Sequence, residues 1–461
     1  MDIFFLPPLM RYFCPLTNQI MSPFAVKALQ LLLSLSLLIV LHELGHFIPA
    51  KLFKTRVEKF YLFFDVKYSL FKKKIGETVY GIGWLPLGGY VKIAGMIDES
   101  MDKEQMAGPP QPWEFRSKPA WQRLIIMLGG VTVNIIVGLV IYISILFFYG
   151  RDVITADDMP EGFVVHEIFQ EYGFRDGDLV LELNDEPFDY QNELNKSLFL
   201  KEVRSLTVRH REGGIERIEL PTDIGTLMFQ QDVLKPFEYM RNNQIDTVLA
   251  DFPAGLAGLQ KGDLILNTNG TEVTHWHEFN KAINKTPGAE NTLVYERDGV
   301  RDTLMIATAE TGQLGLNNFG RQWLNRGTHL SFSLGESLSS GTSYGVGILT
   351  DYVKQFKYVF TKKGATQVGG FGAIGNMFPG QWDWLSFWQT TALISIILAF
   401  MNILPIPALD GGHVMFLLYE MVSGKKPNDK FMEYAQMVGF FLLIGLVLFA
   451  NGNDLVRWIF G

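Results

Sequence analysis

The sequence is poor in cysteine: Cys14 is the only one among 461 residues. A disulfide framework and a thiolate zinc cage both need several cysteines, so neither can be built from this chain alone. Basic residues are outnumbered, since 40 lysines and arginines stand against 48 acidic residues, and no basic tract is interleaved with aromatic residues. This balance argues against nucleic-acid binding. Any metal site must therefore use histidine and carboxylate ligands.

Hydrophobic residues, by contrast, make up 48% of the chain, which is high for a purely soluble protein. Four segments are apolar over about 20 residues or more, the length that crosses a bilayer. They run approximately over residues 24–53, 124–149, 384–404 and 434–450. The sequence therefore predicts a multi-pass membrane protein with soluble parts.

Lysine and arginine gather in the loops on one side of these segments. They are dense in residues 54–123 and 421–430 and sparse just after the second segment. Because loops rich in basic residues stay in the cytoplasm, we expect these two loops to be cytoplasmic. The long region between the second and third segments is then expected to face outward.

The outward region contains an internal repeat. The stretch GFRDGDLVLELND at 173–185 aligns with GLQKGDLILNTNG at 258–270, an offset of 85 residues. Each copy predicts a Gly-Asp turn followed by an alternating strand and a second turn. Two tandem β-rich domains are expected, at 151–226 and 227–312. They resemble PDZ domains, which implies a groove that takes an extended peptide as an added strand.

The remaining domain boundaries follow from the apolar segments. Residues 1–23 are expected to be an N-terminal extension, 24–150 to hold the first two transmembrane helices, and 384–461 to hold the last two. The stretch 313–383 contains apolar residues near helical spacing. It predicts either an amphipathic helix on the membrane surface or a helix packed on a neighbouring domain, and the sequence does not choose between them.

The first apolar segment contains HELGH, with His42, Glu43 and His46. On a helix, H-E-x-x-H sets two imidazoles on one face, where both can reach one zinc ion, and sets the glutamate beside them as a general base. An ionisable group at the centre of a transmembrane helix costs about 2.5 to 3.5 kcal/mol. A bound metal would offset that cost.

A third ligand is expected near the end of the third apolar segment, in MNILPIPALDGGH at 401–413. Asp410 and His413 are both candidates there. The first and third segments run in the same direction, so their polar clusters lie at the same depth. Asp410 is preferred because it is closer to the helix end and because the two prolines before it break the helix.

These features together resemble the bacterial site-2 proteases of the RseP type. The motif N-x-x-P-x-P-x-L-D-G is matched at every specified position by Asn402, Pro405, Pro407, Leu409, Asp410 and Gly411. The resemblance covers the chain from about residue 22. It implies a mainly α-helical membrane core of four transmembrane helices with a membrane-associated β-hairpin or sheet, plus two inserted α+β PDZ-like domains.

The resemblance also implies roles for individual residues. His42, His46 and Asp410 would bind zinc, and Glu43 would be the general base. Substrate-binding residues are expected in three places: the G-x-x-x-N motif of the second helix, the third helix, and a membrane-dipping hairpin at 81–95. They are Asn134, Asn402, Gly88, Gly89 and Tyr90. One departure is Phe63, Phe64 and Asp65, where many family members have Gly-Phe-Gly.

The implied activity is that of an intramembrane zinc metalloprotease carrying out regulated intramembrane proteolysis. Its expected substrates are single-span membrane proteins, such as anti-sigma factors already cut by a first protease, or remnant signal peptides. The expected location is the bacterial inner membrane, in contact with the lipid bilayer, with periplasmic PDZ domains and an active site near the cytoplasmic face.

Two other hypotheses come from different classes. A non-proteolytic PDZ scaffold would have no need to keep His42, Glu43, His46 and Asp410 together. An ion or proton transporter could use intramembrane acids and histidines, but it would not need two histidines flanking a glutamate at this spacing, and no inverted repeat is apparent. Metal content separates both hypotheses from a zinc protease.

Overall fold

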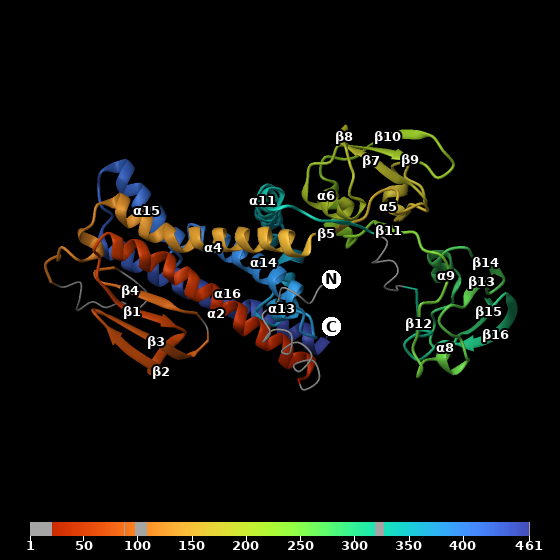
Figure 1. The fold of residues 1–461 in the computed structure, drawn as a ribbon, viewed down its shortest axis with the longest axis horizontal. Helices are drawn as coiled ribbons and strands as arrows, with labels where there is room; N and C mark the ends of the chain where they lie inside the picture. Colours follow the sequence, from red (N-terminus) through yellow and green to blue (C-terminus); the bar gives the residue numbers. More distant parts are fainter. Residues whose placement is uncertain (1–20, 87, 97–107, 319–326, 461) are drawn as a thin grey trace. The chain divides into compact units, whose positions relative to one another are not determined.

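The computed structural model describes residues 21–86, 88–96, 108–318 and 327–460 (Figure 1). The chain divides into two compact units: Met1–Gly150 with Ser331–Gly461, and Arg151–Leu330. The predicted extension at 1–23 lies almost entirely outside the described residues.

The first unit contains four helices that are long and apolar enough to cross a membrane. They are α2 (Pro23–Leu52), α4 (Ala120–Tyr149), α14 (Trp384–Ile403) and α16 (Asp429–Phe460). The four predicted apolar segments all lie within or at the ends of these helices. The last helix extends beyond its predicted segment at both ends, because polar residues at its termini dilute the apolar signal without breaking the helix.

Helices α2, α4 and α14 pack on one another and form the centre of this unit. The helix α2 begins at Pro23, a residue suited to the first turn, and its N-cap Ser22 accepts a hydrogen bond from the Ala25 backbone N–H at 3.3 Å. Leu38 of α2 and Ile396 of α14 are almost completely buried. Some polar residues of these helices are buried with them, among them Gln30, Asn134 and Ser395.

A four-stranded sheet lies between α2 and α4 in the sequence and packs against α2. Its strands are β1 (Val57–Leu62), β2 (Phe64–Ile75), β3 (Thr78–Leu85) and β4 (Tyr90–Ile93). The strand order is β2-β3-β1-β4, with β1 parallel to β3 and antiparallel to β4.

The predicted hairpin at 81–95 is therefore wrong in its pairing. The strands β3 and β4 flank the expected turn, but β1 lies between them, so they do not pair with each other. The glycines after Pro86 predict a tight connection, yet strand order depends on long-range contacts that a local pattern does not report. The real hairpin in this sheet is β2–β3, which turns at Gly76 (φ 61°).

The segment between the second unit and α14 forms three helices, α11 (Leu334–Val359), α12 (Lys362–Gln367) and α13 (Phe371–Asn376). The helix α11 packs on α4 and α14, and the Tyr344 ring meets the Tyr142 ring edge to face at 5.1 Å. Its opposite face exposes Val346 and Val353, each about half accessible. The sequence offered two interpretations of this segment, a helix on the membrane surface or a helix packed on a neighbour. The structure shows a packed face, and it also shows an exposed apolar face of the kind that the first interpretation requires.

The end of the first unit has one more helix, α15 (Asp410–Ser423), which follows α14 after a six-residue connection and packs on α4. Its N-cap is Leu409, and the left-handed residue Gly424 (φ 67°) ends it.

The second unit contains two β-rich halves, each with a four-stranded sheet of order β10-β9-β7-β8 or β14-β13-β15-β16. The elements of the first half are β5 (Arg151–Val153), β6 (Phe163–Val165), α5 (Glu167–Gln170), β7 (Leu179–Leu183), β8 (Glu186–Pro187), α6 (Leu194–Leu200), β9 (Ser205–Arg209), β10 (Ile215–Glu219), α7 (Ile224–Gln231) and β11 (Phe237–Tyr239). Those of the second half are β12 (Thr247–Val248), α8 (Pro253–Leu256), β13 (Leu264–Thr268), β14 (Thr271–Glu272), α9 (Trp276–Ala282), β15 (Glu290–Arg297), β16 (Val300–Ala307) and β17 (Leu316–Asn317). The last strand of the unit, β18 (Thr328–Leu330), returns to the first half and pairs antiparallel with β5.

The repeat places equivalent Gly-Asp turns in the two halves. Asp178 is buried and contacts the His210 Nδ1 at 2.7 Å, while Asp263 is buried and accepts from Arg297 at 2.6 Å. Both carboxylates therefore hold their own sheet together. That these halves are PDZ domains stays a prediction.

The predicted boundary at 226/227 is wrong. It falls inside α7, and Met228 and Phe237 belong to the hydrophobic core of the first half. The strand β11 also pairs with β6 of that half. The repeat offset fixes the distance between equivalent turns, but it carries no information on where each half ends.

Candidate active site

Three side chains that could bind a metal meet inside the first unit: His42, His46 and Asp410. The Nε2 atoms of the two histidines are 3.2 Å apart, because residues four apart on α2 lie one turn apart on the same face. The Asp410 Oδ2 lies 3.4 Å from the His42 Nε2 and 3.3 Å from the His46 Nε2. The three ligand atoms thus form a nearly equilateral triangle.

Asp410 reaches this triangle because the chain between α14 and α15 is irregular. Helix α14 ends at Ile403, and Pro405 and Pro407 prevent its continuation. Ala408 adopts a left-handed backbone conformation with φ 74°, which is unusual for a residue with a side chain. Asp410 then begins α15, where the positive end of the helix dipole favours a carboxylate.

The triangle fits zinc. Zinc bonds to histidine nitrogen and carboxylate oxygen are about 2.0 to 2.2 Å long, so a tetrahedral ion holds its ligands roughly 3.3 to 3.5 Å apart. The observed separations of 3.2 to 3.4 Å agree with that spacing. Within the described residues, the Asp410 Oδ2 is also buried and without a hydrogen-bond donor, which a metal would remedy. Three protein ligands leave a fourth position open, as in catalytic zinc sites.

Each histidine is oriented through its other ring nitrogen. The His46 Nδ1 lies 2.8 Å from the Ile126 carbonyl oxygen of α4, so this nitrogen carries the proton and donates it. The His42 Nδ1 lies 3.2 Å from the Asn134 side-chain amide. The Asn134 Oδ1 lacks a partner among the described residues, and exchanging its amide oxygen and nitrogen would let it accept from the His42 Nδ1–H. Both Nε2 atoms are then free to bind a metal.

Close contact between α2 and α4 makes this geometry possible. A Cβ atom added to Gly45 would lie 2.6 Å from the Gly129 carbonyl carbon, so the two helices touch backbone to backbone. A Cβ atom added to Gly130 would lie 2.8 Å from the His42 Nε2. Gly45 and Gly129 were not predicted as site residues. The signal for them was present, since Gly45 is one of the two free positions inside HELGH.

Glu43 lies beside the sheet rather than in the triangle. Its carboxylate accepts a hydrogen bond from the Val91 backbone N–H of β4. A Cβ atom added to Gly89 would lie 3.5 Å from the Glu43 Cγ. Among the described residues, β4 is an edge strand of the sheet, with β1 as its one neighbouring strand. An acid next to the metal ligands therefore faces the edge of a sheet.

The five predicted substrate-binding residues fall into two groups. Asn134 and Asn402 both contact His42, with the Asn402 Nδ2 at 3.5 Å from its Nε2. The other three lie in or just before β4. Gly89 packs tightly on Ile39 of α2, so its missing side chain makes room for that helix. The Tyr90 ring stacks on Tyr61 and Phe64, and its hydroxyl donates to Asp65 at 2.7 Å.

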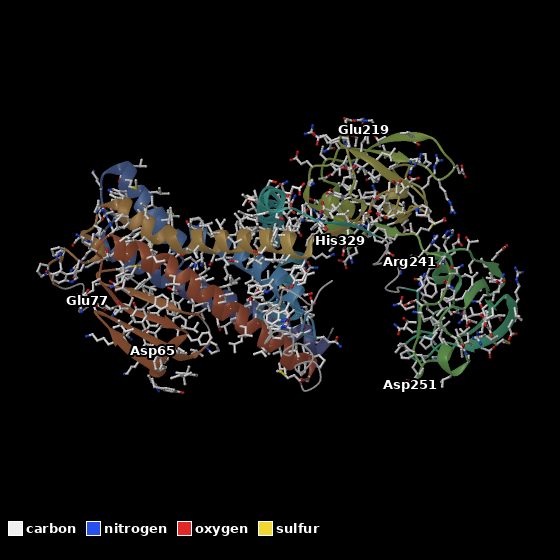
Figure 2. All side chains as sticks on the ribbon, viewed as in Figure 1. Asp65, Glu77, Glu219, Arg241, Asp251 and His329 are labelled. Carbon is white, nitrogen blue, oxygen red and sulfur yellow. The ribbon has the colours of Figure 1, made fainter. Side chains whose placement is uncertain are left out.

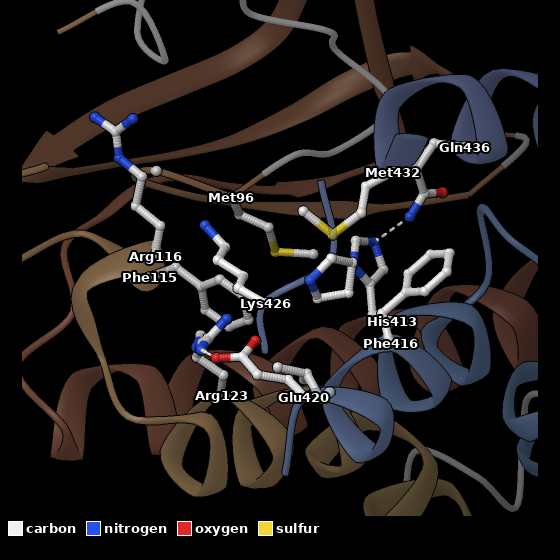
Figure 3. A pocket seen from close by; sticks show the side chains of 13 residues that line it. Met96, Phe115, Arg116, Arg123, His413, Phe416, Glu420, Lys426, Met432 and Gln436 are labelled. Carbon is white, nitrogen blue, oxygen red and sulfur yellow. Dashed lines mark hydrogen bonds and ion pairs between the residues drawn. The ribbon is translucent and has the colours of Figure 1, made fainter. Parts of the chain in front are cut away.

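His413, the competing ligand candidate, does not join the triangle. Its Nε2 lies 2.7 Å from the Gln436 Nε2 of α16 (Figure 3). The Gln436 Oε1 also accepts from the Ala408 backbone N–H. Gln436 therefore links α16 to the loop that carries Asp410, next to a pocket of about 50 Å³. No sequence motif singles out Gln436, because its role depends on a contact between distant segments.

One further pattern in the sequence does not form a site. Gly341-Thr342-Ser343-Tyr344-Gly345 has the G-x-S-x-G spacing of a serine nucleophile elbow, which requires a sharp turn from a strand into a helix. Here the five residues lie inside α11. The two glycines instead let α11 approach Ile143 and Leu139 of α4.

Comparison with known proteins agrees with this geometry. The family model described as "Peptidase family M50" matches residues 30–446. The chain belongs to peptidase family M50. That family consists of zinc-dependent membrane proteases of the site-2 type, and this chain is accordingly a zinc metalloprotease with membrane-spanning helices. The predicted family, enzyme class and metal are confirmed.

Relatives of similar length match over nearly the whole chain. A protein of Vibrio cholerae named "Putative zinc metalloprotease" is 27% identical, covering 92% of this chain and 97% of its own length. One of Thermotoga maritima with the same name is 26% identical over 92% and 98%. The "Regulator of sigma E protease" of Haemophilus influenzae is 26% identical over 92% and 98%.

Proposed function

We propose that this M50 protease cuts the transmembrane segments of single-span membrane proteins within the bilayer. The observation that supports this most directly is the position of the His42, His46 and Asp410 triangle. It lies among helices long and apolar enough to span the membrane, rather than in the second unit. A protease site at that depth can reach only the membrane segments of its substrates.

In this proposal His42, His46 and Asp410 hold the zinc ion and Glu43 is the general base. Zinc in such a site acts as a Lewis acid that polarises a carbonyl group and makes water nucleophilic at neutral pH. Glu43 removes the proton of the attacking water and passes it to the departing amine nitrogen. Ile126 and Asn134 keep the two imidazoles in the required tautomer. Asn402, at the end of α14, is close enough to donate to a substrate carbonyl.

A membrane-spanning substrate helix has its carbonyls engaged in internal hydrogen bonds, so the cleaved stretch must first unwind. Within the described part of the chain, the outer edge of β4 has no neighbouring strand, and it lies beside Glu43. Pairing with that edge would replace the lost hydrogen bonds inside the membrane. Gly88 and Gly89 have no side chain that would obstruct a substrate strand, and Tyr90 anchors β4 through the Asp65 carboxylate.

The resemblance implies two classes of substrate. They are single-span proteins such as anti-sigma factors that have lost most of their outer domain, and remnant signal peptides. The name of the Haemophilus influenzae relative supports the first class. The second unit, with its two PDZ-like halves on the periplasmic side of the inner membrane, would exclude substrates that still carry a bulky domain. The site then lies near the cytoplasmic face, in reach of water.

The first experiment measures zinc content and cleavage of a single-span test substrate by the detergent-purified chain. Wild type and Glu43→Gln are both expected to carry one zinc ion per chain, because Glu43 is not a ligand, and only wild type should cleave. Glu77→Gln is the matched control, since Glu77 is exposed in the β2–β3 turn. Equal cleavage by Glu43→Gln and wild type would refute the assigned base.

The third ligand is tested in the same preparation. Asp410→Asn is expected to lose zinc, whereas His413→Gln should retain it, because His413 contacts Gln436 and lies outside the triangle. The opposite result would show that the loop presents His413 to the metal. Absence of zinc from the wild-type chain under metal-replete conditions would refute the metal assignment altogether.

A further inference from the structure

The hairpin β2–β3 has an exposed face that no other described segment covers. The strand β2 forms one edge of the sheet, and most of its side chains are accessible. Its apolar residues include Leu70, which is 66% exposed. The exposed apolar side chains of the hairpin include Val66, Tyr68, Leu70, Phe71, Ile82 and Trp84. An accessible apolar edge of this kind invites aggregation in water but is favourable in lipid.

Lysines are concentrated at the other end of the same hairpin. Residues 57–93 contain six lysines and three acidic residues. Two of the acids are already paired, since Lys92 lies 3.6 Å from Glu58 and Lys59 lies 3.3 Å from Asp65. Apart from these two pairs, the segment contains one acidic residue, Glu77, and four lysines. These are Lys67 and the consecutive Lys72, Lys73 and Lys74, all exposed. We call the last three the lysine collar.

The register of the sheet fixes the depth of the collar relative to α2. Lys74 pairs with Val79, and Val79 pairs with Lys59, shortly after α2 ends at Leu52. The collar therefore lies level with the C-terminal end of α2, beside the lysines that follow this helix.

The opposite end of the sheet lies along the middle of α2. Phe64 of β2 pairs with Leu85, and Gly89 shortly after it packs on Ile39 of α2. Ile39 precedes the end of α2 at Leu52 by 13 residues, or about 20 Å along a helix that rises 1.5 Å per residue. Figure 2 labels Glu77 and Asp65 at the two ends of this hairpin. The apolar end is thus at membrane depth and the collar is at the membrane surface.

We infer that the lysine collar binds the phosphodiester headgroups of anionic phospholipids in the leaflet at the C-terminal end of α2. Charge complementarity selects this occupant, because three adjacent lysines with a single acid nearby match a negatively charged lipid surface. Successive side chains of a strand point to opposite faces, so the collar can reach headgroups on both sides of the hairpin. The long lysine side chains extend toward the headgroups while the apolar end stays among the acyl chains.

This contact would hold the sheet at a fixed depth, and with it the β4 edge beside Glu43. It depends on the membrane position of α2 and on the exposed hairpin, and it does not depend on the proposed function. A failure of the protease assignment would leave it untouched.

The test measures hydrogen–deuterium exchange of residues 64–76 in the full-length chain, placed in nanodiscs of phosphatidylcholine alone or mixed with phosphatidylglycerol. Among the described residues, the outer edge of β2 has no partner strand, so its outward amides lack the protection that pairing with β3 gives to the inward ones, and lipid is what would cover them. We expect protection to rise on the order of 100-fold with phosphatidylglycerol, because each of the three basic residues contributes about fivefold to the attraction to an anionic surface. The triple variant K72Q/K73Q/K74Q should lose this increase, and K72R/K73R/K74R should keep it.

The matched control, K201Q/K235Q/K285Q, removes the same charge from exposed lysines of the second unit and should behave as wild type. High salt should abolish the lipid dependence in the wild-type chain, which tests the charge without any substitution. Equal protection in the two lipids, or an increase retained by K72Q/K73Q/K74Q, would overturn the inference. So would protection by soluble glycerophosphoglycerol in phosphatidylcholine discs, because the ligand would then be a free phosphodiester.

Discussion

Gly130→Ala is the substitution that tests the metal site most sharply, because it adds one methyl group next to two proposed ligands. The added Cβ atom would lie 2.5 Å from the His42 Cε1 and 2.8 Å from its Nε2, and closer still to the His46 Nε2. Ordinary contacts between such atoms are about 3.5 to 4.0 Å. Each imidazole would have to retreat by roughly 1 Å, whereas zinc bond lengths tolerate about 0.2 Å.

The imidazoles have little room to retreat. His46 is only 7% exposed, and it donates a hydrogen bond to the carbonyl of Ile126, which lies on α4 like Gly130. Disturbing the orientation of metal-binding side chains weakens metal affinity about 10- to 100-fold, and the upper figure corresponds to roughly 2.7 kcal/mol. We therefore expect zinc affinity, measured by competition with a chelator at fixed free zinc, to fall about 100-fold in Gly130→Ala.

Gly138→Ala is the matched control on the same helix. Its added Cβ atom would lie 2.8 Å from the Ile396 Cγ1 of α14, and it touches no proposed ligand. Both variants should lose about 1 to 3 kcal/mol of folding stability through overpacking, but only Gly130→Ala should lose zinc. Wild-type zinc affinity in a folded Gly130→Ala chain would refute the arrangement of ligands described above.

Three further substitutions test other parts of the structure. Gln436→Ala should weaken zinc binding about 10-fold by freeing the loop before Asp410, while Gln436→Glu, which still accepts from the Ala408 N–H, should weaken it less; equal zinc affinity in all three chains would contradict this. Arg123→Gln leaves the half-buried Glu420 carboxylate without its partner at 2.5 Å, so the free energy of unfolding should fall by about 3 to 5 kcal/mol and the midpoint of thermal unfolding should fall with it. Adding Glu420→Gln should restore the midpoint. Asp178 and Glu216 accept hydrogen bonds from His210 and raise the pKa of its imidazole above the usual value of about 6.5. The stability it contributes is complete below that value and is lost as the pH rises through the higher pKa of the folded state, so the unfolding midpoint should fall more steeply above pH 6.5 in wild type than in His210→Gln.

The parts of the structure that could be predicted are those encoded by local periodicity. Four long apolar segments give four helices, and residues four apart on α2 bring two imidazoles together whatever surrounds them. Asp410 required one more step, since the helix before it, α14, and α2 had to run in the same direction. That step used only the distribution of lysine and arginine, which is again a local property of the sequence.

The parts that could not be predicted depend on contacts between distant segments. The insertion of β1 between β3 and β4 is invisible to an alternating pattern, because the pattern gives the faces of a strand and not its neighbours. Gln436 has an ordinary sequence context, and only the position of α16 beside Ala408 gives it a role. The boundary near residue 226 failed for the same reason, since β11 returns to pair with β6.

The glycines of the site belong both to a local sequence motif and to a contact between distant segments. Gly45 lies inside the zinc motif, yet the structure uses it for contact with Gly129. A side chain at either position would separate α2 from α4, and the separation would move His46 away from the Ile126 carbonyl that orients its ring. The spacing of H-E-x-x-H therefore places two histidines on one face, but it does not set their tautomers. Gly45, the small residue between the histidines, allows α4 to pack close enough for its Ile126 carbonyl to set the tautomer of His46. The motif alone is therefore a weaker signal of a zinc site than the motif together with Gly129, Gly130 and Asn134 on α4.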